Sequence, residues 1–190
     1  MANSDGANGT TFVLSQRYIG ERVTRALEKI DPLAIARAVE ILVKAPQIFV
    51  YGAGRSGIIG RAFAMRLVQA GLRAYVIGES VTPIVRAGDA VFLLSAQGES
   101  YSSIQTGNIV RREGASLIVL TAKSESKIAH TASHLLSINF EEDPDQPRYA
   151  PLGTLFEEAS LRLTDALVAE LLRVRGETEE SMRRRHAIMV

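Results

Sequence analysis

The chain contains no cysteine, so it has no disulfide framework, no thiolate metal site and no thiol nucleophile. It also lacks an apolar run of the ~18–20 residues that a membrane span requires, and its N-terminus lacks the apolar core of a signal peptide. The formal net charge is only +1, which gives no signal for a nucleic-acid or membrane partner. We therefore expect a cytoplasmic protein that binds neither.

Apolar residues are abundant: they make up 46% of the 190 residues, which excludes general disorder and allows one sizeable core. The first ten residues, MANSDGANGT, are small and polar. We expect residues 1–10 to form a flexible tail. The remainder, residues 11–190, is expected to form a single domain.

Stretches with helical spacing of apolar residues alternate with short apolar runs. The pattern predicts helices over 12–30, 32–44, 56–70, 100–113, 126–132 and 151–175, and strands over 47–51, 73–77, 90–94, 116–121 and 134–138. A proline-bearing loop is expected over 139–150, and a charged helical tail after Gly176. Strands that alternate with helices and are apolar on both faces predict a doubly wound, five-stranded parallel sheet of the α/β class.

Two small-residue loops each follow a predicted strand. The first is Gly52-Ala-Gly-Arg-Ser-Gly57 and the second is Ser95-Ala-Gln-Gly-Glu-Ser100. Such a loop presents backbone N–H groups and hydroxyls at the positive end of a helix, where an anion can bind. In the strand order 2-1-3-4-5 both loops flank one crevice. We therefore expect a phosphate site made from Gly54, Arg55, Ser56, Ser95, Gln97 and Ser100.

The first loop also fits the G-x-G-x-x-G pattern of dinucleotide-binding folds. Glu79 ends the second predicted strand, where such folds place a ribose-binding acid. An NAD(P)-binding oxidoreductase is therefore an alternative. Two features weigh against it, because the serines of the second loop have no role in that motif and the chain is short for a cofactor domain plus a substrate domain.

Six segments give the sequence a specific resemblance to the sugar isomerase (SIS) domain family, and within it to the 6-phospho-3-hexuloisomerase group. They are FVYGAGRSG (49–57), FAMRL (63–67), VIGESVTP (76–83), APLGTLFE (150–157), DALVAEL (165–171) and RRHA (184–187). The resemblance implies a SIS-type fold in dimers or tetramers with active sites near subunit boundaries. One position departs from the family pattern, since Gln97 stands where the second loop usually has a serine.

The resemblance also implies an activity, the interconversion of 6-phospho-3-hexulose and fructose 6-phosphate in the ribulose monophosphate route of formaldehyde assimilation. It suggests functional coupling to a hexulose-6-phosphate synthase. Moving a carbonyl from C3 to C2 needs one carboxylate to remove and return a proton through a cis-enediol(ate), and a donor for the oxyanion. No metal or redox cofactor is needed, so we expect none.

Glu157 is the candidate base. It is expected in the second turn of a helix that opens at Pro151, where Glu157 and Glu158 could instead simply complement the helix dipole. The APLGTLFE match favours the catalytic role. His186 follows three arginines in the tail, and the RRHA match suggests an acid that acts in its own or a neighbouring subunit's site. A lone histidine there could equally be merely exposed.

The other candidates each have a structural alternative. Ser56, Ser95 and Ser100 could be caps or turn residues, and Arg55 could form a surface ion pair. Glu79 could bind sugar hydroxyls, replace Glu157 as base, or be a solvated strand end. A non-catalytic sugar-phosphate sensor is the alternative function. Apolar positions on helices 12–30 and 151–175 predict a homo-oligomer, unless both helices pack only on their own sheet.

Overall fold

The computed structural model describes residues 9–188. The predicted tail therefore falls almost wholly outside the described residues. Thr10 is already the N-cap of the first helix, with Oγ1 accepting from the Val13 N–H at 3.5 Å. No helix in residues 9–188 combines the length and the apolar character that crossing a membrane would require.

A five-stranded parallel sheet forms the centre of the molecule, in the predicted order β2-β1-β3-β4-β5. Ile48 at the start of β1 pairs in register with Ala74 on one side and Ala90 on the other. The α/β fold class and the strand order are thus confirmed. The strands are β1 (Ile48–Gly52), β2 (Ala74–Val76), β3 (Ala90–Leu94), β4 (Ser116–Thr121) and β5 (His134–Ser137).

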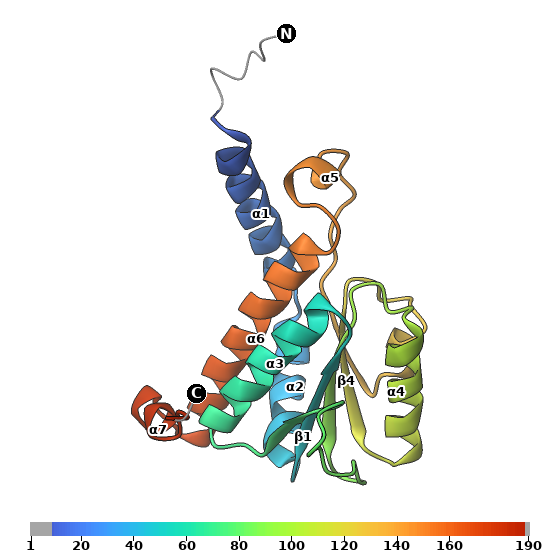
Figure 1. The fold of residues 1–190 in the computed structure, drawn as a ribbon, viewed down its shortest axis with the longest axis vertical. Helices are drawn as coiled ribbons and strands as arrows, with labels where there is room; N and C mark the ends of the chain where they lie inside the picture. Colours follow the sequence, from blue (N-terminus) through green and yellow to red (C-terminus); the bar gives the residue numbers. More distant parts are fainter. Residues whose placement is uncertain (1–8, 189–190) are drawn as a thin grey trace.

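Helices cover both faces of the sheet, as Figure 1 shows, with α4 on the face opposite α2, α3 and α6. Helix α1 packs along α6 and extends beyond the sheet toward α5. The helices are α1 (Thr11–Glu28), α2 (Pro32–Lys44), α3 (Arg55–Gln69), α4 (Tyr101–Arg112), α5 (Gln146–Tyr149), α6 (Thr154–Arg175) and α7 (Glu179–Arg184).

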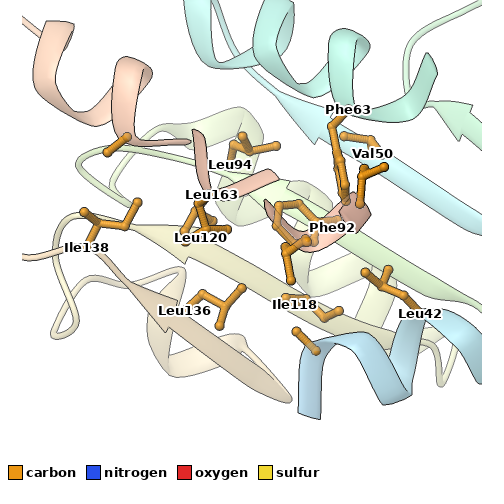
Figure 2. Packing of buried hydrophobic residues seen from close by; sticks show 14 of the residues in the cluster. Leu42, Val50, Phe63, Phe92, Leu94, Ile118, Leu120, Leu136, Ile138 and Leu163 are labelled. Carbon is orange, nitrogen blue, oxygen red and sulfur yellow. The ribbon is translucent and has the colours of Figure 1, made fainter. Parts of the chain in front are cut away.

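The larger core lies between the sheet and the α2, α3 and α6 layer (Figure 2). Phe92 of β3 packs there against Phe63 of α3, with ring centroids 4.9 Å apart. Its neighbour Val91 belongs to a smaller core on the other face, with Val110 of α4. Every residue of β3 is therefore buried, which explains its uninterrupted apolar sequence.

Three segments differ from the predicted pattern. The helix predicted over 126–132 is a single 3₁₀ turn, Ala129–Thr131, and the preceding Ile128 is joined to the second loop by a hydrogen bond from its N–H to the carbonyl of Gly98. The predicted loop over 139–150 contains the short helix α5. Helix α6 begins at Thr154 and not at Pro151, since Leu152 has a φ of 56° that no helix accommodates.

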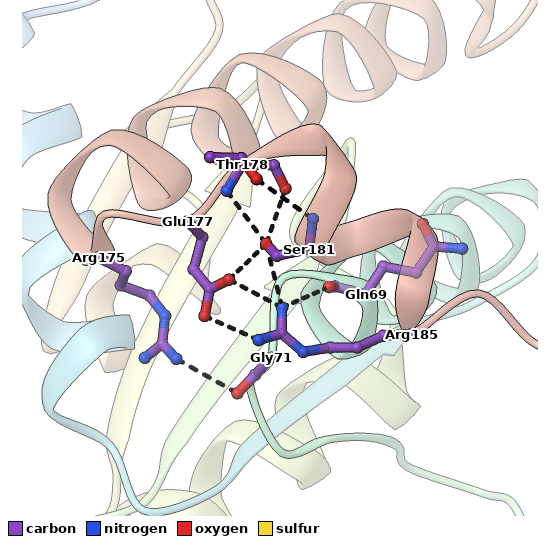
Figure 3. Close-up of polar contacts among 7 residues, drawn as sticks. All are labelled: Gln69, Gly71, Arg175, Glu177, Thr178, Ser181 and Arg185. Carbon is purple, nitrogen blue, oxygen red and sulfur yellow. Dashed lines mark hydrogen bonds and ion pairs between the residues drawn. The ribbon is translucent and has the colours of Figure 1, made fainter.

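The C-terminal helix α7 is held against the far end of α3. The Arg185 guanidinium donates to both carboxylate oxygens of Glu177 and to the carbonyl of Gln69, the last residue of α3 (Figure 3). Arg175 at the end of α6 donates to the carbonyl of Gly71. These contacts fix the chain after α6 at the end of that helix opposite its N-terminus.

Candidate active site

The two small-residue loops leave the sheet from adjacent positions. Gly52 at the end of β1 is the register partner of Leu94 at the end of β3. The helices that follow, α3 and α4, cover opposite faces of the sheet (Figure 1). This is the switch point where open α/β sheets bind ligands beyond the carboxyl ends of their strands.

Glycine is required in the first loop for close packing and for backbone conformation. A Cβ on Gly57 would lie 2.4 Å from the carbonyl oxygen of Gly52, so only glycine lets α3 begin so close to β1. Gly54, the N-cap of α3, has a φ of 58°. The G-x-G-x-x-G spacing is therefore accounted for by the tight β1–α3 turn, with no dinucleotide needed to explain it.

The predicted serines take different places around this crevice. Ser56 lies in the first turn of α3 and Ser95 directly after β3, and both are largely buried. Ser100 is exposed and caps α4, with its Oγ accepting from the Ser103 N–H at 3.3 Å. The hydroxyls of Ser100 and Ser103 are 2.6 Å apart. Ser100 thus performs the capping role, whether or not it also binds a ligand.

Glu157 lies directly beside the first loop. Its Oε2 is 2.5 Å from Nε of Arg55, the first residue of α3, and only 13% of its side chain is exposed. Because α6 begins at Thr154, Glu157 is in the first turn of the helix and not in the second as predicted. Its Oε1 lies over Gly153, where an added Cβ would be 3.0 Å away. The candidate base and Arg55 of the candidate phosphate loop are therefore brought together.

A hollow of about 140 Å³ opens next to these groups. Gln97 of the second loop and Lys123 after β4 line the hollow at the ends of the strands. Gly153 and Phe156 line it at the start of α6. The segment before α5, including Glu142, also lines the hollow. Gln97, the residue that departs from the family pattern, thus faces the same space as the helix that carries Glu157.

Lys123 also lines the hollow, and the sequence analysis did not single it out. It follows β4, the strand next to β3, and its side chain is exposed at the rim of the hollow. The sequence could have indicated Lys123 through its position just beyond the carboxyl end of a predicted central strand, because open α/β sheets bind ligands at that edge. It adds a positive charge on the side of the hollow formed by Gln97.

Glu79 forms an ion pair away from Glu157. Its carboxylate forms an ion pair with Arg61 of α3, and both side chains are substantially exposed. Arg61 lies six residues after Arg55, which turns it about 120° away around the helix. Glu79 therefore contacts a different side of α3 from the one that holds Glu157.

His186 lies far from Glu157 within one chain. It follows Arg185, which is anchored at the end of α3, while its own Nδ1 is 2.8 Å from the carbonyl of Ala187. Arg175, the last residue of α6, comes 18 residues after Glu157, which corresponds to about 27 Å along the helix. Figure 1 shows α7 at the opposite end of α6 from α5. A single subunit does not bring these two residues together.

The fold is an open α/β sheet with a crevice beyond the carboxyl ends of its strands, and comparison with known proteins identifies the family. The SIS domain family model matches residues 41–169, and the chain belongs to that family. The sugar isomerase resemblance found in the sequence is thereby confirmed.

Individual relatives are similar over most of their length. The chain is 35% identical to a 3-hexulose-6-phosphate isomerase of Methylomonas aminofaciens, covering 80% of this chain and 84% of the relative. It is 34% identical to the protein of that name from Bacillus subtilis, covering 84% of this chain and 86% of the relative. A crystal structure from Methanococcus jannaschii, whose inferred function is 3-hexulose-6-phosphate isomerase, superposes with a TM-score of 0.85 at 25% identity, covering 93% and 99%.

Proposed function

We propose that this protein is a cofactor-independent isomerase that interconverts 6-phospho-3-hexulose and fructose 6-phosphate in the cytoplasm. The observation that carries the proposal is the Glu157 carboxylate, 13% exposed and held by Arg55 at the edge of the phosphate-binding crevice. The names of the relatives supply the substrate class. The ribulose monophosphate route and coupling to a hexulose-6-phosphate synthase are parts of the same proposal.

In this mechanism Glu157 takes the proton from C2 of the 3-ketose, and the C2–H electron pair forms the C2–C3 double bond of a cis-enediol(ate). Glu157 then delivers the proton to C3, while a proton moves from O2 to O3, so that the carbonyl ends at C2. Atoms and charge balance without an oxidant. One carboxylate suffices because it holds the proton between the two half-reactions.

The substrate phosphate binds at the two loops, with Ser56, Ser95 and backbone N–H groups in the first turns of α3 and α4. Arg55 links this anion to the chemistry. Its side chain is 71% exposed and belongs to the first loop, so a bound phosphate competes with Glu157 for its guanidinium. Loss of that partner frees the carboxylate to act as a base. Gln97 and Lys123 then face the sugar or its phosphate across the hollow.

The test is to incubate the purified, EDTA-treated protein with 6-phospho-3-hexulose in D₂O without added metal or NAD(P), and to follow the products by NMR. We expect fructose 6-phosphate with solvent deuterium at C3, because a proton held on a carboxylate exchanges with solvent. Binding of the sugar phosphate without turnover would favour the sensor. Activity that required a nicotinamide cofactor would favour the oxidoreductase.

A further inference from the structure

No backbone constraint explains the glycine at position 153. Gly153 is the N-cap of α6 and has a φ of −84° and a ψ of 6°, which residues with a side chain also adopt. The reason lies in packing. The three atoms nearest to an added Cβ all belong to Glu157, with Oε1 at 3.0 Å, Cδ at 3.3 Å and Cγ at 3.8 Å. A side chain at position 153 would therefore stand against the Glu157 carboxylate.

Glu157 reaches back over Gly153 because the two residues are one helical turn apart. The Glu157 N–H donates to the carbonyl of Gly153 at 2.9 Å, and the side chains of a helix lean toward its N-terminus. This lean carries the carboxylate across Gly153 to Arg55. Gly153 thus forms one side of the space in which the carboxylate lies, and Arg55 forms another.

The two oxygens of this carboxylate have different surroundings. Oε2 accepts from Nε of Arg55 at 2.5 Å, whereas no group in residues 9–188 donates a hydrogen bond to Oε1. A lone pair that already accepts from a guanidinium is less available to a proton than a free one. The free lone pairs are those of Oε1, on the Gly153 side. This side stays the same when a bound phosphate draws Arg55 away.

Gly153 also lines the hollow of about 140 Å³ that Gln97 and Lys123 share. It therefore borders both the carboxylate and the space proposed for the sugar. Because the Glu157 side chain is only 13% exposed, few approaches to it remain. The missing Cβ at position 153 leaves one of them open, from the hollow to Oε1.

We propose that Oε1 of Glu157 is the oxygen that takes the proton from C2 and returns it to C3, and that Gly153 is a positioning residue that keeps this oxygen open to the hollow. The inference rests on the proposed isomerase function and adds the direction of approach to it. C2 and C3 of the sugar lie on the Gly153 side of the carboxylate. Between the two half-reactions the proton is held on Oε1 as a carboxylic acid.

The test is Gly153→Ala, assayed with 6-phospho-3-hexulose and titrated calorimetrically with fructose 6-phosphate. The new methyl covers Oε1 or displaces the carboxylate, so we expect kcat to fall at least ~10-fold while the Kd and the number of binding sites per chain stay at the wild-type values. A loss of folded protein would lower the number of sites instead. Gly20→Ala in α1, where an added Cβ meets no atom within 4 Å, is the control and should keep the wild-type kcat.

Two further measurements separate this role from a structural one. In the Glu157→Gln background, Gly153→Ala should lower kcat by less than ~3-fold, because a residue that acts through the carboxylate has nothing left to position. Amidation with a carbodiimide and glycine ethyl ester, followed by mass spectrometry, measures access to the carboxylate without turnover. We expect Gly153→Ala to slow the labelling of Glu157 and to leave the labelling of the adjacent Glu158 unchanged.

Gly153→Ser adds the same Cβ but is a favoured N-cap residue, and it replaces Gly153→Ala if that variant does not fold. A folded variant with the wild-type kcat, in a protein that isomerises the substrate, overturns this inference and leaves the proposed function standing. So does a full additional loss in the Glu157→Gln background, or unchanged labelling of Glu157. A wild type that binds fructose 6-phosphate but does not isomerise 6-phospho-3-hexulose overturns the proposed function, and with it the role of Oε1. The labelling then decides only whether Gly153 opens the carboxylate.

Discussion

Nε of Arg55 lies 2.5 Å from Oε2 of Glu157 and joins the first residue of α3 to the first turn of α6, 102 residues further along the chain. The contact connects the loop expected to bind phosphate with the carboxylate expected to move the proton. We propose that this ion pair holds Glu157 in place without substrate and releases it when phosphate binds.

Replacing Glu157 by glutamine keeps the shape of the side chain and removes the base. We expect Glu157→Gln to lower kcat by ~10²–10⁴ with little change in KM, because the carboxylate acts in the transition state. Steady-state assays with 6-phospho-3-hexulose measure this. The matched control is Asp165→Asn, an exposed acid two turns further along α6, which should leave turnover unchanged. Near-full activity in Glu157→Gln would redirect the search for the base to Glu79.

Loss of the Ser56 hydroxyl should weaken binding and spare the chemical step. A hydrogen bond to a charged phosphate contributes roughly 1.5–3 kcal/mol, so we expect Ser56→Ala to raise the substrate Kd by ~10–150-fold. Isothermal titration with the substrate in the Glu157→Gln background measures the affinity without turnover. Ser102→Ala, on the exposed side of α4, is the control. An unchanged Kd would remove Ser56 from the phosphate site.

Ser100 allows its cap role to be separated from a role in binding. Ser100→Ala should lower the stability by about 1 kcal/mol, because the α4 cap to the Ser103 N–H is lost. Ser100→Asp keeps a good cap but places a negative charge beside the phosphate loop. We expect it to unfold at nearly the wild-type temperature and yet to bind substrate poorly. Wild-type affinity in Ser100→Asp would show that Ser100 is a cap only.

The sequence predicted most of the fold because its signals are local. The apolar run of β3 and the glycines at positions 52 and 57 reflect burial and a tight turn that each segment needs. The Arg55–Glu157 and Arg61–Glu79 pairs could not be predicted in the same way. Each depends on how α3 packs against distant elements and on which side of the helix each arginine lies.

Two predicted helix boundaries, the start at Pro151 and the helix over 126–132, were wrong because tertiary contacts decide them. Pro151 is a favourable first helical residue, and the sequence gives no sign that Leu152 adopts a positive φ and delays α6 to Thr154. The segment 126–132 has helical spacing, but it is joined to the second loop by a hydrogen bond from the Ile128 N–H to the carbonyl of Gly98. In both cases long-range packing outweighs the local preference.

The contacts of Arg185 with Glu177, which hold α7 against the end of α3, should weaken in acid. Hydrogen bonds from Arg185, and then from Ser181, lower the pKa of Glu177 from 4.5 to about 2. Because the pKa of Glu177 is lower in the folded state, the stabilisation from its ionised carboxylate is fully present above about pH 4.5. This stabilisation is lost as the pH falls toward 2. Figure 3 shows both donors at the carboxylate.

We therefore expect Glu177→Gln to unfold at a lower temperature than wild type at pH 7, with a smaller difference at pH 3. Thermal unfolding monitored by circular dichroism at pH 7, 5, 4 and 3 measures the trend. Glu180→Gln, on the exposed side of α7, should show little difference at any of these pH values. A Glu177→Gln difference that is as large at pH 3 as at pH 7 would exclude this linkage.

His186 is the last candidate, and its place at the far end of α6 makes its role depend on assembly. In a homo-oligomer that pairs two α6 helices antiparallel, the C-terminal end of one helix would lie alongside the N-terminal end of the other. The tail that carries His186 then approaches the end of the second copy that carries Glu157. A shared site is therefore expected to require both copies.

Mixing two inactive variants, Glu157→Gln and His186→Ala, tests the shared site. A mixed dimer has one site with both residues intact and one with neither. Random exchange makes about half of the dimers mixed, so about a quarter of the wild-type activity should return. Exchange is followed by native mass spectrometry, and a mixture of Glu157→Gln with the double variant is the control that cannot recover. No recovery despite confirmed exchange would place His186 outside a shared site, and a fully active His186→Ala would remove it from the reaction.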